Sequence, residues 1–360
     1  MTATSPPSAD AQLAFLAKLQ RLFAEGDFTA TYKFALLIAL ADLAVELGRD
    51  DGSELVLLTR QLGERFLDLY WRHVTPYGQG RVGSEPGVLV QNNGPQAAVI
   101  SAIGEFRARV SATSPQVAAR HSSYPALLSK VTHTVSALPL THLQNFGGAT
   151  DEFLYNRPAP GRVRLKPGVM YCLRRFQPLI QQLARAHWLA HVKGNRRNHS
   201  MLGEADDLEE FLFSTSRQSL STMAEGLRRL DGAHCFYCRG SLTSANVDHF
   251  IPFSQYPRDL AHNFVLAHPS CNRSKSDTLA GKQHLERWLA RLSFRADDIA
   301  ELGAQAGLVG DAAVCRRVAS WGYSSALAAG GAAWLAPDSF EAIDDSYIEC
   351  LESHSKATVG

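Results

Sequence analysis

The sequence predicts a mainly α-helical protein of two or three domains, with a small cysteine-containing unit near its C-terminal end. Apolar residues recur at three- and four-residue spacing through much of the N-terminal part, which places them on one face of a helix. The chain has 360 residues, 45% of them hydrophobic, enough for a sizeable core, so disordered and collagen-like classes are excluded. Among six cysteines, three cluster between Cys235 and Cys271, and this uneven spacing favours metal binding over a disulfide framework.

The N-terminal region is predicted to be a helical bundle. Residues 11–48 have the pattern of two helices, with Thr29 or Thr31 as candidate N-caps and Gly48 as the stop. Further helices are predicted over 54–73, 95–110 and 116–138. A literal GxGxxG at Gly78, Gly80 and Gly83 lacks the preceding strand and following helix of a dinucleotide site, so it predicts a surface loop.

A short hairpin and a long helix are predicted next along the chain. Apolar residues alternate over 151–166 around a proline-rich turn at 156–161, which indicates two paired strands. The helical pattern then returns over 168–193.

Charge is segregated along the chain although its net value is only +1. Residues 157–197 hold ten basic side chains and no acidic one, which makes this basic segment a candidate track for the phosphates of a nucleic acid. The candidate DNA-binding residues are Arg174, Arg175, Arg196 and Arg197. The alternative is a solvated helix face whose charges are paired by the acidic residues of 204–210 or by the acidic region 296–360.

Four ligands in two matched pairs predict a structural zinc site. Cys235-x2-Cys238 is followed by His268-x2-Cys271, and four sulfur or nitrogen ligands complete a tetrahedral site with no position left for water. Binding of the ion and folding of this small unit are expected to be one event. The alternative for His268 is a buried core residue, because a histidine near a cysteine need not be a ligand.

A second set of residues lies between and beside the two pairs. Asp248 and His249 end an apolar, β-favouring run, and Asn272 follows Cys271 on a helix that Pro269 can open. Consecutive helical residues diverge by about 100°, so Asn272 can face the Asp248–His249 strand while Cys271 faces zinc. Carboxylate and amide oxygens suit Mg²⁺ or Mn²⁺, and a histidine can take a proton from water.

These motifs resemble the HNH, or ββα-metal, endonucleases in the zinc-knuckle form. The resemblance covers about residues 230–288 and departs at His268 and Asn272, where many members have cysteine and histidine. It implies that His249 is the general base, that Asp248 and Asn272 hold one Mg²⁺ or Mn²⁺ ion, and that Asn263 holds the His249 ring. Lys275 and Arg273 would meet phosphate oxygens.

The predicted function is metal-dependent hydrolysis of double-stranded DNA, and the family resemblance suggests restriction or antiphage defence as the setting. Alternatives are a zinc-stabilised DNA-binding or scaffolding protein with an idle HNH module, and an RNA-cleaving nuclease. Besides DNA, the expected partners are a second copy of the chain in a homo-oligomer, or a protein or nucleic-acid activator. Because residues 1–10 lack the regions of a signal peptide and the apolar stretch 34–47 contains two acidic residues, a cytoplasmic protein without a membrane partner is expected.

The predicted organisation has four parts. They are a disordered tail (1–10), a helical recognition or regulatory region (11–227), the HNH nuclease module (228–290) and a helical, acidic C-terminal region (291–360).

Overall fold

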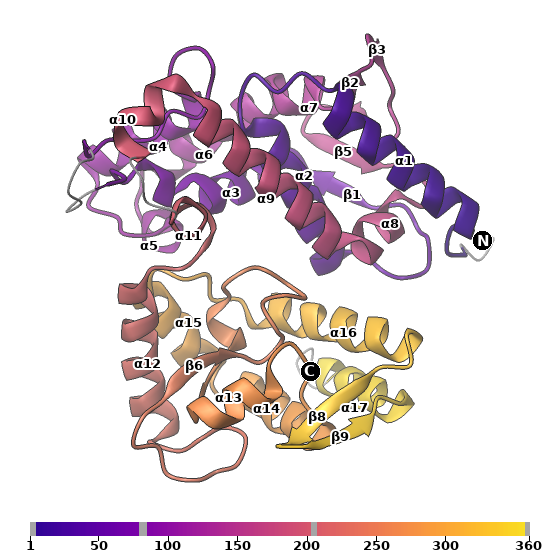
Figure 1. The fold of residues 1–360 in the computed structure, drawn as a ribbon, viewed down its shortest axis with the longest axis vertical. Helices are drawn as coiled ribbons and strands as arrows, with labels where there is room; N and C mark the ends of the chain where they lie inside the picture. Colours follow the sequence, from indigo (N-terminus) through magenta and orange to yellow (C-terminus); the bar gives the residue numbers. More distant parts are fainter. Residues whose placement is uncertain (1–4, 79–84, 203–206, 357–360) are drawn as a thin grey trace. The chain divides into compact units, whose positions relative to one another are not determined.

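The computed structural model describes residues 5–78, 85–202 and 207–356, and the chain divides into two compact units, Met1–Ser214 and Thr215–Gly360. Helices dominate both units, as the sequence predicted (Figure 1). The four predicted parts of the chain have other bounds than these units and remain a prediction. Within the described ranges, no helix has the length and apolar character needed to span a membrane.

The N-terminal unit contains most of the predicted helices. Its helices are α1 (Ala9–Glu25), α2 (Tyr32–Leu47), α3 (Thr59–Tyr70), α4 (Ala98–Arg109), α5 (Pro115–Ala119), α6 (Tyr124–Ala137), α7 (Pro139–His142), α8 (Val169–Arg175), α9 (Gln177–Gly194), α10 (His199–Leu202) and α11 (Leu208–Phe213), with 3-10 turns η1 (Arg72–Val74) and η2 (Arg196–Asn198). The start of α1 at Ala9 falls inside the tail predicted to be disordered, and residues 1–4 lie outside the described ranges.

Helix α2 is the centre of this unit. Every residue from Tyr32 to Glu46 is buried, which is the expected state of a helix that is apolar on all sides. Helices α3, α8 and α9 contact it. Thr31 precedes its first turn without a side-chain capping bond, and Gly48 ends it, so the sequence located both ends of this helix.

The predicted long helix over 168–193 is two helices, α8 and α9, separated at Phe176. Pro178 lies in the first turn of α9. A proline there has no N–H to donate and its ring collides with the carbonyl four residues earlier, so a continuous helix cannot pass.

The predicted hairpin is present and belongs to a three-stranded antiparallel sheet of order β1-β5-β4. The strands of this unit are β1 (Val56–Leu58), β2 (Asn145–Phe146), β3 (Ala149–Thr150), β4 (Tyr155–Ala159) and β5 (Arg162–Leu165), with β2 and β3 paired separately. Strand β1 was predicted to be helical. Its three residues form a strand because β5 pairs with them, and that long-range contact has no local signal.

The C-terminal unit surrounds a small antiparallel pair with helices. Its elements are α12 (Arg217–Asp231), β6 (Asn246–His249), η3 (Ala261–Asn263), β7 (Phe264–Ala267), α13 (Pro269–Lys275), α14 (Lys282–Phe294), α15 (Ala296–Ala306), α16 (Ala312–Ala328), β8 (Ala332–Ala336), β9 (Ser339–Ala342) and α17 (Asp345–Lys356). Strand β6 pairs with β7, and His249 lies opposite Phe264. Pro269 opens α13, as expected. The β8–β9 hairpin was not predicted, and β8 contacts α13 and α14 (Figure 1).

Of the GxGxxG glycines, Gly78 has a left-handed backbone (φ 78°). Gly80 and Gly83 lie outside the described residues.

Candidate metal centre and active site

The four predicted zinc ligands converge. One ligand atom from each of Cys235, Cys238, His268 and Cys271 lies within 4.8 Å of the other three. Cys271 lies in the first turn of α13, and His268 immediately precedes that helix at the end of β7. Three sulfurs and one imidazole at this spacing fit tetrahedral zinc in a site closed to water.

The His268 ring is oriented so that one nitrogen faces the sulfurs. Its Nδ1 lies 3.2 Å from Cys238 Sγ, and its Nε2 lies 3.0 Å from the carbonyl oxygen of Ser241. The carbonyl can only accept, so Nε2 carries the proton and Nδ1 presents its lone pair to the cluster. Fixing the tautomer through the second nitrogen is the usual support for a histidine ligand.

Backbone groups favour the thiolate of Cys235. Burial raises the pKa of this thiol, but backbone N–H groups, including that of His268 at 3.4 Å, outweigh it and lower the pKa to about 7. Burial and the neighbouring thiols raise the pKa of Cys271 to about 12. One thiolate is therefore favoured without an ion, and a cation is needed to hold all three sulfurs in that form.

The catalytic residues predicted from the sequence lie on two neighbouring elements. Asp248 and His249 end β6, and Asn272 lies on α13, which contacts β6. The Asp248 side chain is 8% exposed, and its Oδ2 accepts a hydrogen bond of 2.5 Å from the Tyr237 hydroxyl. Among the described residues, the Asp248 Oδ1 atom and the amide of half-buried Asn272 have no hydrogen-bond partner. Both hard donors are thus available to a cation.

Lys275 does not lie where a phosphate could reach it. Its side chain is fully buried, with Nζ 2.9 Å from the carbonyl oxygen of His249 and 3.4 Å from Asp248 Oδ2. Burial lowers its pKa, and the charge of Asp248 opposes this effect. The predicted phosphate contact is therefore corrected: Lys275 is an interior residue that contacts the end of strand β6. Arg273, on the same helix, is exposed.

Asn263 does not hold the His249 ring either. Both polar atoms of its amide bond the backbone of Ile251, at 2.8 Å each, which fixes the loop after β6. The His249 ring pairs instead with Asp259, since Nε2 lies 2.6 Å from Oδ1. Burial raises the pKa of Asp259, but the bonds from His249 and Thr215 outweigh it and bring the pKa below its usual value.

Sequence reasoning missed Asp259 and Tyr237, for different reasons. Asp259 is one of several polar residues in an irregular loop, and its spacing from His249 follows no periodicity. Tyr237 lies inside the first cysteine pair, where its type gives no indication that the hydroxyl points to Asp248.

Two families match this chain. The family described as a domain of unknown function (DUF8808) matches residues 12–212, which is more than half of the chain. The chain belongs to this family. The HNH endonuclease family matches residues 235–278, the segment that holds the Cys/His cluster. A comparison with curated proteins found no match, and a comparison with solved structures found none. The HNH segment supports a nuclease or nucleic-acid-binding role.

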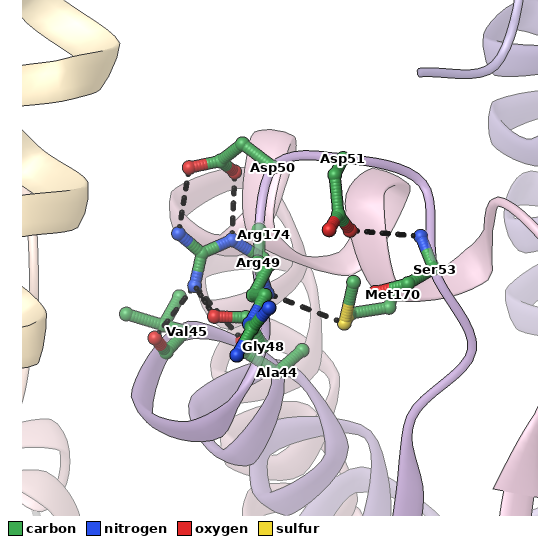
Figure 2. A network of polar contacts seen from close by, with 9 residues as sticks. All are labelled: Ala44, Val45, Gly48, Arg49, Asp50, Asp51, Ser53, Met170 and Arg174. Carbon is green, nitrogen blue, oxygen red and sulfur yellow. Dashed lines mark hydrogen bonds and ion pairs between the residues drawn. The ribbon is translucent and has the colours of Figure 1, made fainter. Parts of the chain in front are cut away.

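Within the DUF8808 domain, Arg174 is an internal residue and not part of a phosphate track. It is 5% exposed and forms a two-bond ion pair with Asp50, at 2.7 and 2.8 Å. Its Nη1 also donates to the carbonyls of Ala44 and Val45 near the end of α2 and to that of Gly48 just after it (Figure 2). The predicted DNA-binding role is corrected: Arg174 ties α8 to the end of α2.

The other three arginines are exposed but do not form one patch. Arg175 precedes α9, whereas Arg196 and Arg197 follow it. That helix has 18 residues, so its ends lie about 27 Å apart. Arg197 donates to the carbonyls of Gly94 and Asn93. DNA binding by these three residues of the DUF8808 domain stays a prediction.

Proposed function

We propose that this protein is a metal-dependent HNH endonuclease that hydrolyses phosphodiester bonds in double-stranded DNA. The observation that supports this most strongly is the arrangement of Asp248, His249 and Asn272 on two elements in contact, beside a cluster fit for zinc. Asp248 Oδ1 and the Asn272 amide oxygen would together hold a divalent cation beside the phosphate. Such a set is suited to attack on phosphorus.

In this proposal His249 takes a proton from the attacking water. Its Nε2 is held by Asp259, so Nδ1 is the nitrogen that accepts the proton. Asp248 and Asn272 would hold Mg²⁺ or Mn²⁺, which supplies neutralisation of the charge that grows on the phosphate and the leaving oxygen. Exposed Arg273 would contact a neighbouring phosphate.

Further parts of the proposal concern the setting. We place the protein in the cytoplasm, in restriction or antiphage defence, with the DUF8808 domain recognising a target, binding an activator or forming a homo-oligomer. These statements rest on the analogy with other HNH proteins.

The proposed activity is tested with supercoiled plasmid and purified protein. With Mg²⁺ or Mn²⁺ the wild type should give nicked or linear DNA, and EDTA should stop the reaction. His249→Ala should lose about 10²- to 10⁴-fold in rate, the usual contribution of a general base. His234→Ala is the matched control, because His234 is an exposed histidine of the same unit without an assigned role.

A second candidate function is a zinc-stabilised DNA-binding protein with an idle HNH module. Lys275, 3.4 Å from Asp248 Oδ2, favours it, because a buried ammonium competes with a metal ion for that carboxylate. Binding of plasmid without cleavage, at any Mn²⁺ concentration, would support this candidate and contradict the endonuclease. Cleavage of RNA but not of DNA would reassign the substrate.

A further inference from the structure

A backbone N–H at the start of the C-terminal unit holds a carboxylate of the same unit. Thr215 is the first residue of that unit, and its N–H donates to Asp259 Oδ2 at 3.2 Å.

The same carboxylate holds the candidate base. Asp259 Oδ1 lies 2.6 Å from His249 Nε2, and the two side chains are 13% and 22% exposed. With one oxygen on the ring and the other on the Thr215 N–H, the carboxylate cannot turn without breaking a bond. An acceptor at Nε2 requires a proton there, which leaves Nδ1 unprotonated. The imidazole is also flanked by Phe253 and Phe264, with ring centroids 5.3 and 4.6 Å away.

We propose that Asp259 is the positioning residue of His249, and that the Thr215 N–H, through its bond to Oδ2, holds the Asp259 carboxylate in place. This inference rests on the proposed nuclease function.

The positioning role is tested by kinetics in the full-length protein. Asp259→Asn should lower kcat about 10²-fold and change KM little, because a misplaced base costs rate and not substrate binding. In a His249→Ala background the same change should cause no further loss, since Asp259 acts through that ring. An equal loss in both backgrounds would show a merely structural role and overturn the proposal.

The ring itself gives a readout that needs no activity. In ¹⁵N-histidine-labelled wild type at pH 8, His249 should be the Nε2–H tautomer, and Asp259→Asn should shift it toward a mixture. Identical tautomers in the two proteins would overturn the positioning role. An inactive wild type with the expected tautomer shift contradicts the proposed nuclease function and leaves the His249–Asp259 link standing.

Discussion

At the scale of single residues, the active-site strand is supported by a buried charge. Lys275 contacts both the Asp248 carboxylate and the His249 carbonyl, and Tyr237 donates to the same carboxylate. Burial raises the pKa of the Tyr237 hydroxyl well above its usual value, so this group remains a donor. Lys275 and Tyr237 together fix Asp248 through Oδ2 and leave Oδ1 for a ligand.

Substituting the two basic residues of α13 should therefore have opposite consequences. Lys275→Met removes one partner of a buried ion pair, so the free energy of unfolding of the C-terminal unit should fall by about 3 kcal/mol. Arg273→Ala should leave stability unchanged and lower the salt dependence of DNA binding by up to ~0.9 in the slope of log K against log salt. Urea denaturation and binding titrations on both variants check this. A reduced salt slope in Lys275→Met with unchanged stability would contradict the buried role.

The sequence predicted the residues whose chemistry follows from spacing and left out those placed by packing. Cys235, Cys238, His268 and Cys271 converge as the matched pairs indicated. Asp259 could not be predicted, because its loop reaches His249 only once β6 and β7 have paired. The interior position of Lys275 could not be predicted either, because its neighbour Arg273 is exposed on the same short helix.

At the scale of elements, the basic segment 157–197 is divided among a sheet, two helices and a turn, so its charges serve different purposes. Arg174 donates to three carbonyls at the C-terminal end of α2, where backbone carbonyls lack full helical pairing (Figure 2). A cation at a helix C-terminus also opposes the helix dipole. A run of like charge in the sequence is therefore no guide to a continuous basic surface.

Neighbouring arginines on α8 allow this to be measured. Arg174→Ala should destabilise the N-terminal unit by about 2–4 kcal/mol, because Asp50 and three carbonyls lose a charged donor. Arg175→Ala should cost little stability. In a His249→Ala background, a drop in the salt slope of DNA binding is expected for Arg175→Ala and not for Arg174→Ala. An Arg174 variant with wild-type stability and a weaker salt slope would restore the phosphate-track interpretation.

Elements that depend on distant partners were the ones the sequence missed. Periodicity located α1 and α2 closely, and the turn chemistry located the β4–β5 hairpin. Strand β1 has three residues, and the hairpin strands β8 and β9 have five and four. These strands are too short for a periodic signal. They form because β5, or the helices of the C-terminal unit, provide the surface on which they pack.

At the scale of the whole molecule, we expect the two units to respond differently to loss of metal. The DUF8808 domain has a large apolar core around α2, whereas the HNH segment contains the Cys/His cluster, whose ion is expected to fix its fold. Removing zinc should therefore act on one unit alone. About one zinc per chain should copurify, and Cys235→Ser or His268→Ala should lose it and unfold the HNH segment.

Asn272→Ala is the control for the zinc prediction, because it should keep the ion and lose the proposed activity. Metal analysis and near-ultraviolet circular dichroism measure the two effects. Folded, active protein without bound zinc would contradict the zinc assignment.

Acid should instead destabilise the DUF8808 domain, through a buried histidine. His73 is 1% exposed; its Nε2 lies 2.9 Å from the Leu212 carbonyl oxygen, and its Nδ1 accepts from the Gln91 amide at 3.0 Å. Burial lowers its pKa from 6.5 to about 4, with a smaller contribution from the charge of Arg72. The neutral ring is satisfied on both sides, and a second proton on Nδ1 would face the donor of Gln91.

The direction of the pH effect follows from which state binds the proton. Between pH 6.5 and about 4 the unfolded chain protonates His73 and the folded chain does not, so stability is complete above pH 6.5 and falls as the pH decreases through this window. A difference of about 2.5 pKa units corresponds to a loss of about 3 kcal/mol by pH 4. Chemical denaturation of the full-length protein at pH 7, 6, 5 and 4 should show this loss in the wild type and a shallower dependence in His73→Gln. His133→Gln, at an exposed position, controls for the loss of a histidine as such. Equal acid sensitivity of the wild type and His73→Gln would assign the effect to carboxylates instead, and would show that the buried network around Gln91 tolerates a charge.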